Sequence, residues 1–154
     1  MDKYQNKNNS KKKVSFLDLY NAFLTYQKIL ERFDRGPVDD GSYFIGYVLI
    51  TSLTCEIGLK ALLKNEGKDS FREHKLDKLF ERLSDHQQKE IANKCHYNIV
   101  DEFKKDLSIN NDHFIAWRYF YEGNCVNFDP FFIKKLIKAL NIELSNIANT
   151  KQNI

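Results

Sequence analysis

The chain contains little proline or glycine, with two Pro and six Gly among its 154 residues. Because both residues interrupt regular structure, their scarcity favours long helices over many short strands. No stretch sustains the alternation of apolar and polar residues that is typical of a half-buried strand. Aromatic residues make up 14% of the chain, which supplies bulky side chains for the core of a domain of this length. The sequence therefore predicts a single all-α domain.

The body of the chain also lacks an excess of basic residues. The formal net charge is +3, but residues 1–13 carry five Lys against one Asp, so the remaining residues carry −1. A nucleic-acid-binding domain usually presents a basic face, so any general attraction for phosphate must come from this tail or from a local patch. Because residues 1–13 are rich in Asn and Lys and poor in apolar residues, we expect a disordered tail in front of a helical bundle at residues 14–150.

Several sequence signals for metals, cofactors and secretion are missing as well. The three Cys are an odd number without metal-type spacing, and no pair of His has the HExxH spacing of a zinc site. A Walker-type glycine-rich phosphate loop is absent. No apolar run follows the N-terminal charges closely enough to form a signal peptide. We therefore expect no metal, no cofactor, reduced buried thiols and a cytoplasmic location.

The most distinctive stretch of the chain is long and apolar. No charge occurs between Tyr43 and Cys55, and a helix that is apolar on nearly every side belongs in the middle of a bundle or in a membrane. Only 13 residues pass before Glu56, whereas a span of the bilayer needs roughly 20. We therefore expect a central core helix at residues 42–65, ended by Gly67, and no membrane association.

Further helices are expected around this central helix, because apolar residues recur at helical spacing on both sides of it. Their expected ranges are Ser15–Phe33, Lys75–Leu83, Ser84–Leu107, Asp112–Glu122 and Asp129–Ile147. Three of them begin with a capping pattern, namely Ser15 with Asp18, Ser84 with Gln87, and Asp129 followed by Pro130. The prediction is an up-and-down bundle of five to six helices.

Two charged residues occupy positions where the pattern predicts apolar side chains. Glu56 lies within the central helix, and Arg118 shares an aromatic stripe with Tyr121. An isolated buried charge is costly, so each should have a partner. The simplest arrangement pairs Arg118 with Glu56 across a helix interface, and Lys60 reaches Glu56 from one turn away. Such a cluster either fixes the register of the helices or binds an anionic ligand such as a phosphate, and the pattern leaves both open.

Short motifs of the chain resemble a known family. CEIGLKALLKNEG at residues 55–67 and HKLDKL at residues 74–79 are similar to HEPN domains (higher eukaryotes and prokaryotes nucleotide-binding). In these helical bundles, a helix with Glu and a following Lys precedes a Gly and a His-x-Leu stretch. WRYFYEG at residues 117–123 falls where the family places an Arg-bearing motif. The resemblance covers about residues 15–149. It implies a HEPN-like fold whose ligand-binding or polar-core residues are Glu56, Lys60, His74, Arg118 and Tyr121.

The resemblance also implies a chemistry. Many members are metal-independent endoribonucleases of toxin–antitoxin, abortive-infection and related defence systems, and two copies of an Arg-x4–6-His motif meet in a dimer. RNA supplies its own 2′-hydroxyl, so the protein moves a proton and stabilises phosphate charge, a task that suits the planar guanidinium of Arg118. Position 124, where the motif allows the His, is Asn124, and an amide is no general base. Glu122 acts as the general base in place of the His only if its pKa is raised.

Three functions follow from these residues. The first is a HEPN-like domain without the usual catalytic His, which binds RNA, a nucleotide or a partner protein in a prokaryotic defence or toxin–antitoxin system. The resemblance implies a homodimer and, as one possible partner, a nucleotidyltransferase-like antitoxin. The second is a metal-independent endoribonuclease that uses Arg118 with Asn124 or Glu122 in an altered site. The third is a structural protein that assembles through exposed aromatic residues between Phe128 and Phe132.

Overall fold

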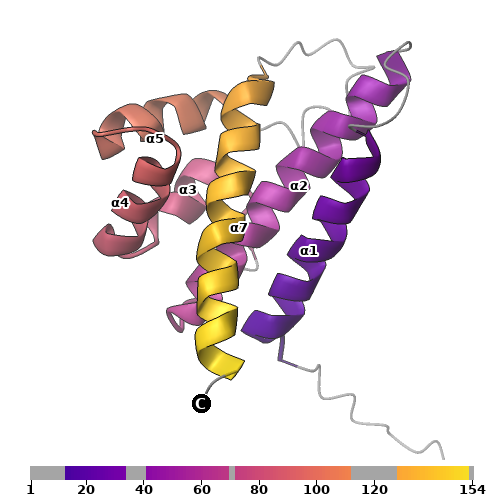
Figure 1. Cartoon of the computed structure of the whole chain (residues 1–154). Coiled ribbons are helices and arrows are strands. Elements are labelled where there is room, and N and C mark those ends of the chain that lie inside the picture. The colour runs from indigo at the N-terminus through magenta and orange to yellow at the C-terminus, as the bar shows by residue number, and fades with distance from the viewer. Residues whose placement is uncertain (1–12, 34–40, 70–71, 112–127, 153–154) are drawn as a thin grey trace, which may run out of the picture.

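The computed structural model describes residues 13–33, 41–69, 72–111 and 128–152. Within these ranges it contains six helices and no strand, which confirms the all-α prediction (Figure 1). The helices are α1 (Phe16–Phe33), α2 (Gly41–Asn65), α3 (Leu76–Glu81), α4 (Asp85–Lys94), α5 (Val100–Ile109) and α7 (Pro130–Gln152). The expected tail, except for its last residue, and the expected helix at residues 112–122 lie outside the described residues.

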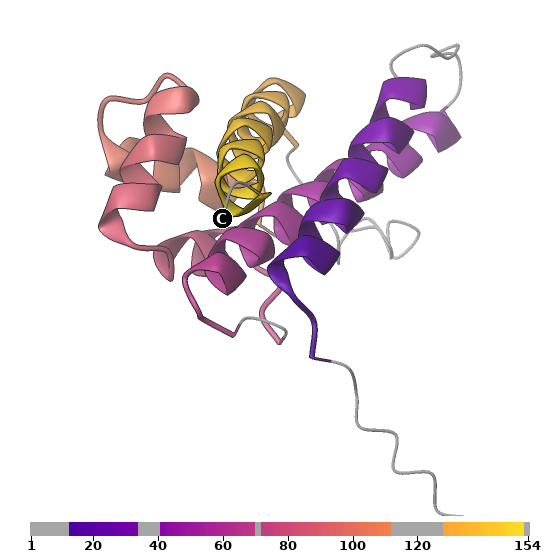
Figure 2. The same ribbon diagram turned by 60° about the horizontal axis from the view of Figure 1, so that its bottom comes forward.

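Helix α2 occupies the centre of the molecule, as predicted. It contacts α1, α7 and α3, and both views show α1 running alongside it as an antiparallel neighbour (Figures 1 and 2). The three short helices α3, α4 and α5 gather on the opposite side of α7 from α1 in Figure 1. Among the side chains of α2 that lose all contact with solvent are Val48, Cys55, Leu59 and Leu63. Burial of these apolar side chains is the main favourable contribution to the fold.

Helices α1 and α7 both pack tightly against α2 at Gly58. A Cβ atom at this position would lie 2.9 Å from Cδ1 of Leu140 on α7 and 3.0 Å from Cε2 of Phe23 on α1. Both neighbouring side chains are fully buried, so they have little room to move. The missing side chain of Gly58 therefore permits α1 and α7 to pack on α2 at the same level.

The predicted helix starts are confirmed where the sequence carries a capping pair. The backbone N–H of Asp18 donates to Oγ of Ser15 at 3.1 Å, and the backbone N–H of Ser15 donates to Oδ2 of Asp18 at 2.9 Å. Ser84 caps α4 by accepting from the backbone N–H of Gln87 at 3.3 Å. Oδ1 of Asp129 accepts from two backbone N–H groups in the first turn of α7, at 3.0 and 3.1 Å. Each cap satisfies donors that have no partner within their own helix.

The end of α2 at Gly67 is also confirmed. Gly67 has a φ of +74°, which glycine adopts without the steric cost that a Cβ imposes. Its N–H donates to the carbonyl of Lys64 at 3.1 Å, and the N–H of Lys68 donates to the carbonyl of Leu63 at 2.9 Å. This pair of bonds is a Schellman motif, and it turns the chain out of α2 toward the segment before α3.

The single helix expected from Ser84 to Leu107 is wrong, because the chain forms α4 and α5 with a break between them. His96 adopts a φ of 67°, and the N–H of Tyr97 donates to the carbonyl of Ala92 at 2.9 Å, so α4 ends in the same motif as α2. The ring of Tyr97 packs against Phe103 and Phe132. This aromatic contact favours the turn over a continuous helix.

Two expectations about individual apolar residues are corrected as well. Ile99 lies at helical spacing from Cys95 and Phe103, which predicts a buried side chain, but it precedes α5 and is 53% exposed. The aromatic residues between Phe128 and Phe132 were expected to be exposed, but Phe132 is buried against Phe103, and the half-buried Phe128 contacts the core. Phe131 alone of these three is exposed, at 79%, because it lies on the outer face of α7.

We predict that Gly58→Ala lowers the free energy of unfolding, by about 1–3 kcal/mol, despite the higher helix propensity of alanine. The added methyl would clash with Leu140 and Phe23. Urea denaturation measures the change. Gly46→Ala is the matched control, since it lies on the same helix and its nearest neighbours are ring atoms of the half-buried Phe33 at 3.3 Å. A Gly58→Ala protein as stable as the wild type would contradict the close crossing.

Candidate functional site

A cluster of three charged or titratable side chains lies where the C-terminal half of α2 meets the segment that leads into α3. Oε1 of Glu56 accepts from Nζ of Lys60 at 2.7 Å and lies 3.0 Å from Nδ1 of His74. Glu56 and Lys60 are one turn apart on α2, the spacing at which side chains of a helix meet. We call these three residues the Glu56 cluster.

Burial differs sharply within the Glu56 cluster. The side chains of Glu56 and Lys60 are only 7% and 8% exposed, whereas that of His74 is 49% exposed. The ion pair is therefore inside the protein, and the imidazole is its contact with solvent. Oε2 of Glu56 is also buried, and no donor of the described part of the chain reaches it. Such an atom is costly to bury without a hydrogen bond.

Local interactions fix the segment that carries His74. Oε1 of Glu73 accepts from the backbone N–H groups of His74 and Lys75, each at 2.9 Å. Hydrogen bonds from the backbone of Lys75 and then of His74 lower the pKa of Glu73 despite the opposing effect of desolvation. Leu76 follows as a buried residue at the start of α3. These contacts fix the backbone on both sides of His74, and the contact with Glu56 fixes its imidazole.

This geometry determines what the imidazole of His74 can do. A carboxylate only accepts hydrogen bonds, so Nδ1 donates to Glu56 and Nε2 remains for a ligand. An imidazole that a carboxylate holds in one orientation is suited to proton transfer. It is equally suited to bind a hydroxyl or phosphate oxygen. The buried ammonium of Lys60 compensates the negative charge of Glu56, so the cluster does not present an uncompensated carboxylate to an anion.

The structure confirms one part of the expected polar cluster. Lys60 pairs with Glu56, as its spacing predicts. The contact between Glu56 and His74 was missed, because 18 residues separate them and only the turn after Gly67 brings them together. Its available signal was the presence of both residues in the two motifs that resemble the family. The remaining predicted site residues, Arg118, Tyr121, Glu122 and Asn124, lie outside the described residues, so the Glu56–Arg118 pair stays a prediction.

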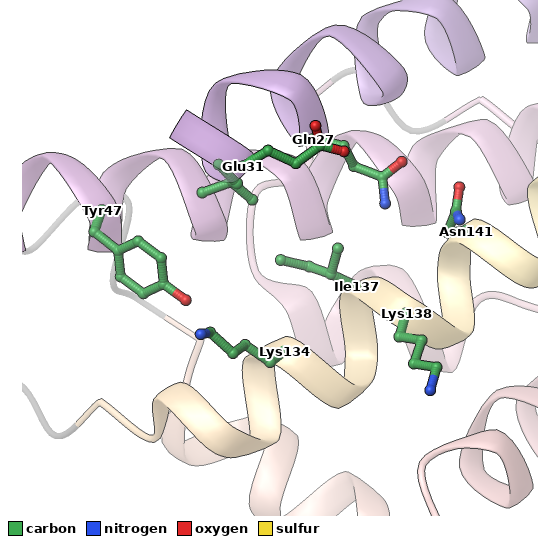
Figure 3. Close-up of a pocket in the computed structure, with 8 residues that line it drawn as sticks. Gln27, Glu31, Tyr47, Lys134, Ile137, Lys138 and Asn141 are labelled. Atoms are coloured by element: carbon green, nitrogen blue, oxygen red, sulfur yellow. The ribbon is translucent and has the colours of Figure 1, made fainter. Parts of the chain in front are cut away.

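A separate pocket lies between α1, α2 and α7, and Figure 3 shows it in close-up. Its volume is about 250 Å³. Leu30 of α1 and Ile137 of α7 supply apolar walls, and both are buried. Its polar lining residues are Gln27, Glu31, Tyr47, Lys134, Lys138 and Asn141. No sequence pattern indicates this pocket, because residues from three helices form it and no single motif contains them.

Lysines of α7 lie beside this pocket. Lys134 and Lys138 are both exposed. Nζ of Lys134 lies 5.8 Å from the centroid of the Tyr47 ring, and Figure 3 shows this side chain reaching toward Tyr47. That distance allows a cation–π contact. The pocket therefore combines an apolar wall, two amide groups, a phenol, a carboxylate and cationic groups.

The described cysteines are buried structural thiols, as predicted. Cys55 and Cys95 are both buried. Desolvation raises the pKa of the Cys55 thiol and raises that of Cys95 to about 12, so neither is a ready nucleophile. Cys125 lies outside the described residues. Within the ranges that the structure describes, no three His, Cys, Asp or Glu side chains gather in a way that could hold a metal ion.

Among the described helices, α2 is long and apolar enough between Tyr43 and Asn65 to cross a membrane by length and composition alone. Of its most apolar 18-residue window, 61% is buried inside the protein. The core helix of a soluble protein passes the same test, so this feature by itself gives no location.

Comparison of the chain with protein-family models, with curated proteins and with solved structures found no match. The likeness to HEPN domains rests on the quoted motif residues.

We predict that Glu56→Ala destabilises the fold by about 3–5 kcal/mol, because it leaves the buried ammonium of Lys60 without its partner. Thermal and urea denaturation measure the loss. Glu90→Ala is the matched control: Glu90 also pairs with a lysine one turn on, at 2.7 Å, but its side chain is 38% exposed. Lys94 keeps a second partner in Glu143, so the control should melt close to the wild type.

A second variant separates charge from packing in this prediction. Replacing both Glu56 and Lys60 by Met removes the buried pair together, and much of the stability should return. Equal melting temperatures for wild type and Glu56→Ala would show that the pair contributes nothing to the core.

Proposed function

We propose that the chain is a HEPN-like helical domain that lacks the usual catalytic His and binds RNA, a nucleotide or a partner protein. The hydrogen bond between Glu56 and His74 carries this proposal. It joins residues 55–67 to residues 74–79, the two stretches whose motifs resemble the family. A resemblance in two separate stretches gains support when their polar residues meet in one cluster.

The chemistry of the Glu56 cluster fits a binding role. Nε2 of the half-exposed His74 is available for a hydroxyl or phosphate oxygen. Arg72 and Lys75 flank this residue closely in the sequence and are both exposed. Together they outweigh the single negative charge of Glu73, so residues 72–75 favour an anionic ligand near the imidazole. A phosphate or ribose group is therefore the chemistry that this site suits best.

The biological setting that we propose comes from the resemblance. It is a prokaryotic defence or toxin–antitoxin system in the cytoplasm, in which the domain acts as a homodimer. A nucleotidyltransferase-like antitoxin is the partner protein that the family pattern suggests.

A metal-independent endoribonuclease is the second candidate, and one observation favours it. The motif at residues 117–124 lacks the family's His, but Glu56 holds the imidazole of His74 in a fixed orientation at 3.0 Å. An oriented imidazole supplies the proton transfer that RNA cleavage needs. In this mechanism Arg118 stabilises the phosphate charge, with Asn124 or Glu122 in the altered motif.

An RNA assay without metal separates the two candidates. We predict that the wild-type protein in EDTA retards a labelled single-stranded RNA on a native gel and leaves it intact on a denaturing gel. His74→Ala should weaken the retardation, because it removes the ligand-facing imidazole. The matched control is His86→Ala, which removes an exposed imidazole of α4.

Cleavage of the RNA in EDTA would contradict the binding role if Arg118→Ala or His74→Ala abolished it while circular dichroism showed an intact fold. That result would instead establish the endoribonuclease. Cleavage that persists in both variants would indicate a contaminating nuclease, and the intact-RNA prediction would then be tested on repurified protein.

A further inference from the structure

One face of α7 carries an aromatic residue and three lysines at helical spacing. Phe131, Lys134, Lys135 and Lys138 follow one another at offsets of 0, 3, 4 and 7 residues, so they share one side of the helix. All four are exposed, and Phe131 is the most exposed large apolar residue of the described chain, at 79%. We call these four residues the α7 stripe. We propose that the α7 stripe and the adjoining pocket bind single-stranded RNA.

The α7 stripe concentrates the positive charge of a body that is otherwise slightly acidic. Outside residues 1–13 the chain carries a formal charge of −1, yet the stripe places three lysines within five residues and no acidic residue lies between Phe131 and Lys138. Lysines on one face of a helix are spaced to contact successive phosphates of a strand. This is the local patch that a phosphate-binding surface requires.

The exposed ring of Phe131 adds a second element of single-strand recognition. Proteins that bind single strands combine a positively charged path for the backbone with aromatic rings on which bases stack. Covering a ring that is largely open to solvent is favourable, because it removes apolar surface from water. A stacked base would cover Phe131, and the lysines beside it would contact the adjoining phosphates.

The pocket between α1, α2 and α7 adjoins the stripe, because Lys134 and Lys138 belong to both. Its volume of about 250 Å³ is below the roughly 300–1,000 Å³ of sites for drug-sized ligands, so it suits one base or nucleoside rather than a whole cofactor. Leu30 and Ile137 would contact the face of the base. The amides of Gln27 and Asn141 would bind its edge.

Glu31 determines the orientation of the strand in this site. Its carboxylate lines the pocket from α1, on the other side from the lysines of α7 (Figure 3). A carboxylate repels phosphate, so the phosphates lie along α7. It accepts a hydrogen bond from a base amino group or from the 2′-hydroxyl, which is the donor that distinguishes RNA from DNA.

An anionic membrane is the other partner that a basic helix could bind, and the packing of α7 argues against it. A helix that lies in a membrane interface inserts a free apolar face into the lipid. The apolar face of α7 is already buried in the protein core, through Ile133, Leu136, Leu140 and Leu144. The exposed side offers two large apolar side chains, Phe131 and Ile142, among charged and polar ones, which fits a nucleic-acid strand better than lipid.

This inference rests on the RNA branch of the proposed function, and it gives the strand a second surface in addition to the Glu56 cluster. The test uses the full-length protein in EDTA, with a labelled single-stranded RNA of mixed sequence and fluorescence anisotropy over a series of salt concentrations. The first variant carries Lys135→Gln and Lys138→Gln. Lys134 is kept, because its ammonium contacts the ring of Tyr47.

We expect this double variant to bind RNA more weakly and to reduce the slope of log K against log salt by about 0.7 for each lysine that contacts a phosphate. The matched control carries Lys89→Gln and Lys105→Gln, which remove the same charge from exposed positions of α4 and α5. Residues 1–13 are present in every protein, so their contribution cancels from the comparison. The control should keep the wild-type slope.

Two further variants test the ring and the pocket. Phe131→Ala should weaken binding at least about fivefold through lost base stacking and leave the melting temperature unchanged, because the ring is exposed. Asn141→Leu should weaken RNA binding while keeping the wild-type salt slope, because it removes a neutral hydrogen-bonding group from the pocket.

Equal affinity and equal salt slope in the stripe variant and its control would overturn this inference, and so would a wild-type protein that binds no RNA. It would also be overturned if vesicles of phosphatidylcholine and phosphatidylserine bound the wild type while RNA did not. RNA cleavage that is lost in Arg118→Ala or His74→Ala would contradict the proposed non-catalytic role. It would not contradict this inference, because the α7 stripe would then bind the substrate RNA.

Discussion

The buried carboxylate of Glu56 is the constraint on which the arrangement around the candidate site depends. It sits at the end of a long uncharged stretch of α2, where a lone charge would be strongly unfavourable. Lys60 supplies the opposite charge from one turn away, and His74 supplies a second contact to the same oxygen. Because His74 lies two residues before the first residue of α3, the carboxylate also ties the start of α3 to α2. A single acidic residue thereby couples core stability to the position of a half-exposed imidazole.

Helix α2 positions both candidate surfaces, because it uses different faces for them. Glu56 and Gly58 are two residues apart, so they point to different sides of the helix. The Glu56 side meets the segment that leads into α3, and the Gly58 side receives Phe23 of α1 and Leu140 of α7. Close packing at Gly58 brings α7 beside α1 and α2, where the pocket and the lysines lie. The Glu56 cluster and the pocket with its lysines are therefore separate surfaces, and α2 contributes residues to both.

Features that depend on local sequence were predicted well. The caps at Ser15, Ser84 and Asp129 and the end of α2 at Gly67 depend on residues within one turn, so the sequence pattern identifies them. The break between α4 and α5 was not predicted, because His96 is not a glycine and the turn depends on contacts of Tyr97 with Phe103 and Phe132.

Features that join distant segments were predicted only in part. Lys60 was identified as a partner of Glu56, since both lie on one helix. His74 was included among the polar residues through the resemblance, but its contact with Glu56 requires the turn after Gly67. The pocket at Leu30 and Ile137 requires the crossing of three helices, and no pattern along one helix contains that information.

The central claim is that Glu56 and His74 act as one unit, and a double-mutant cycle tests it most directly. Unfolding free energies would be measured in urea for wild type, Glu56→Gln, His74→Ala and the double variant. Residues that share a hydrogen bond show a coupling energy of at least about 0.5 kcal/mol, and we predict a value of this size. Effects that add within about 0.3 kcal/mol would show that the two side chains are independent and would contradict the account.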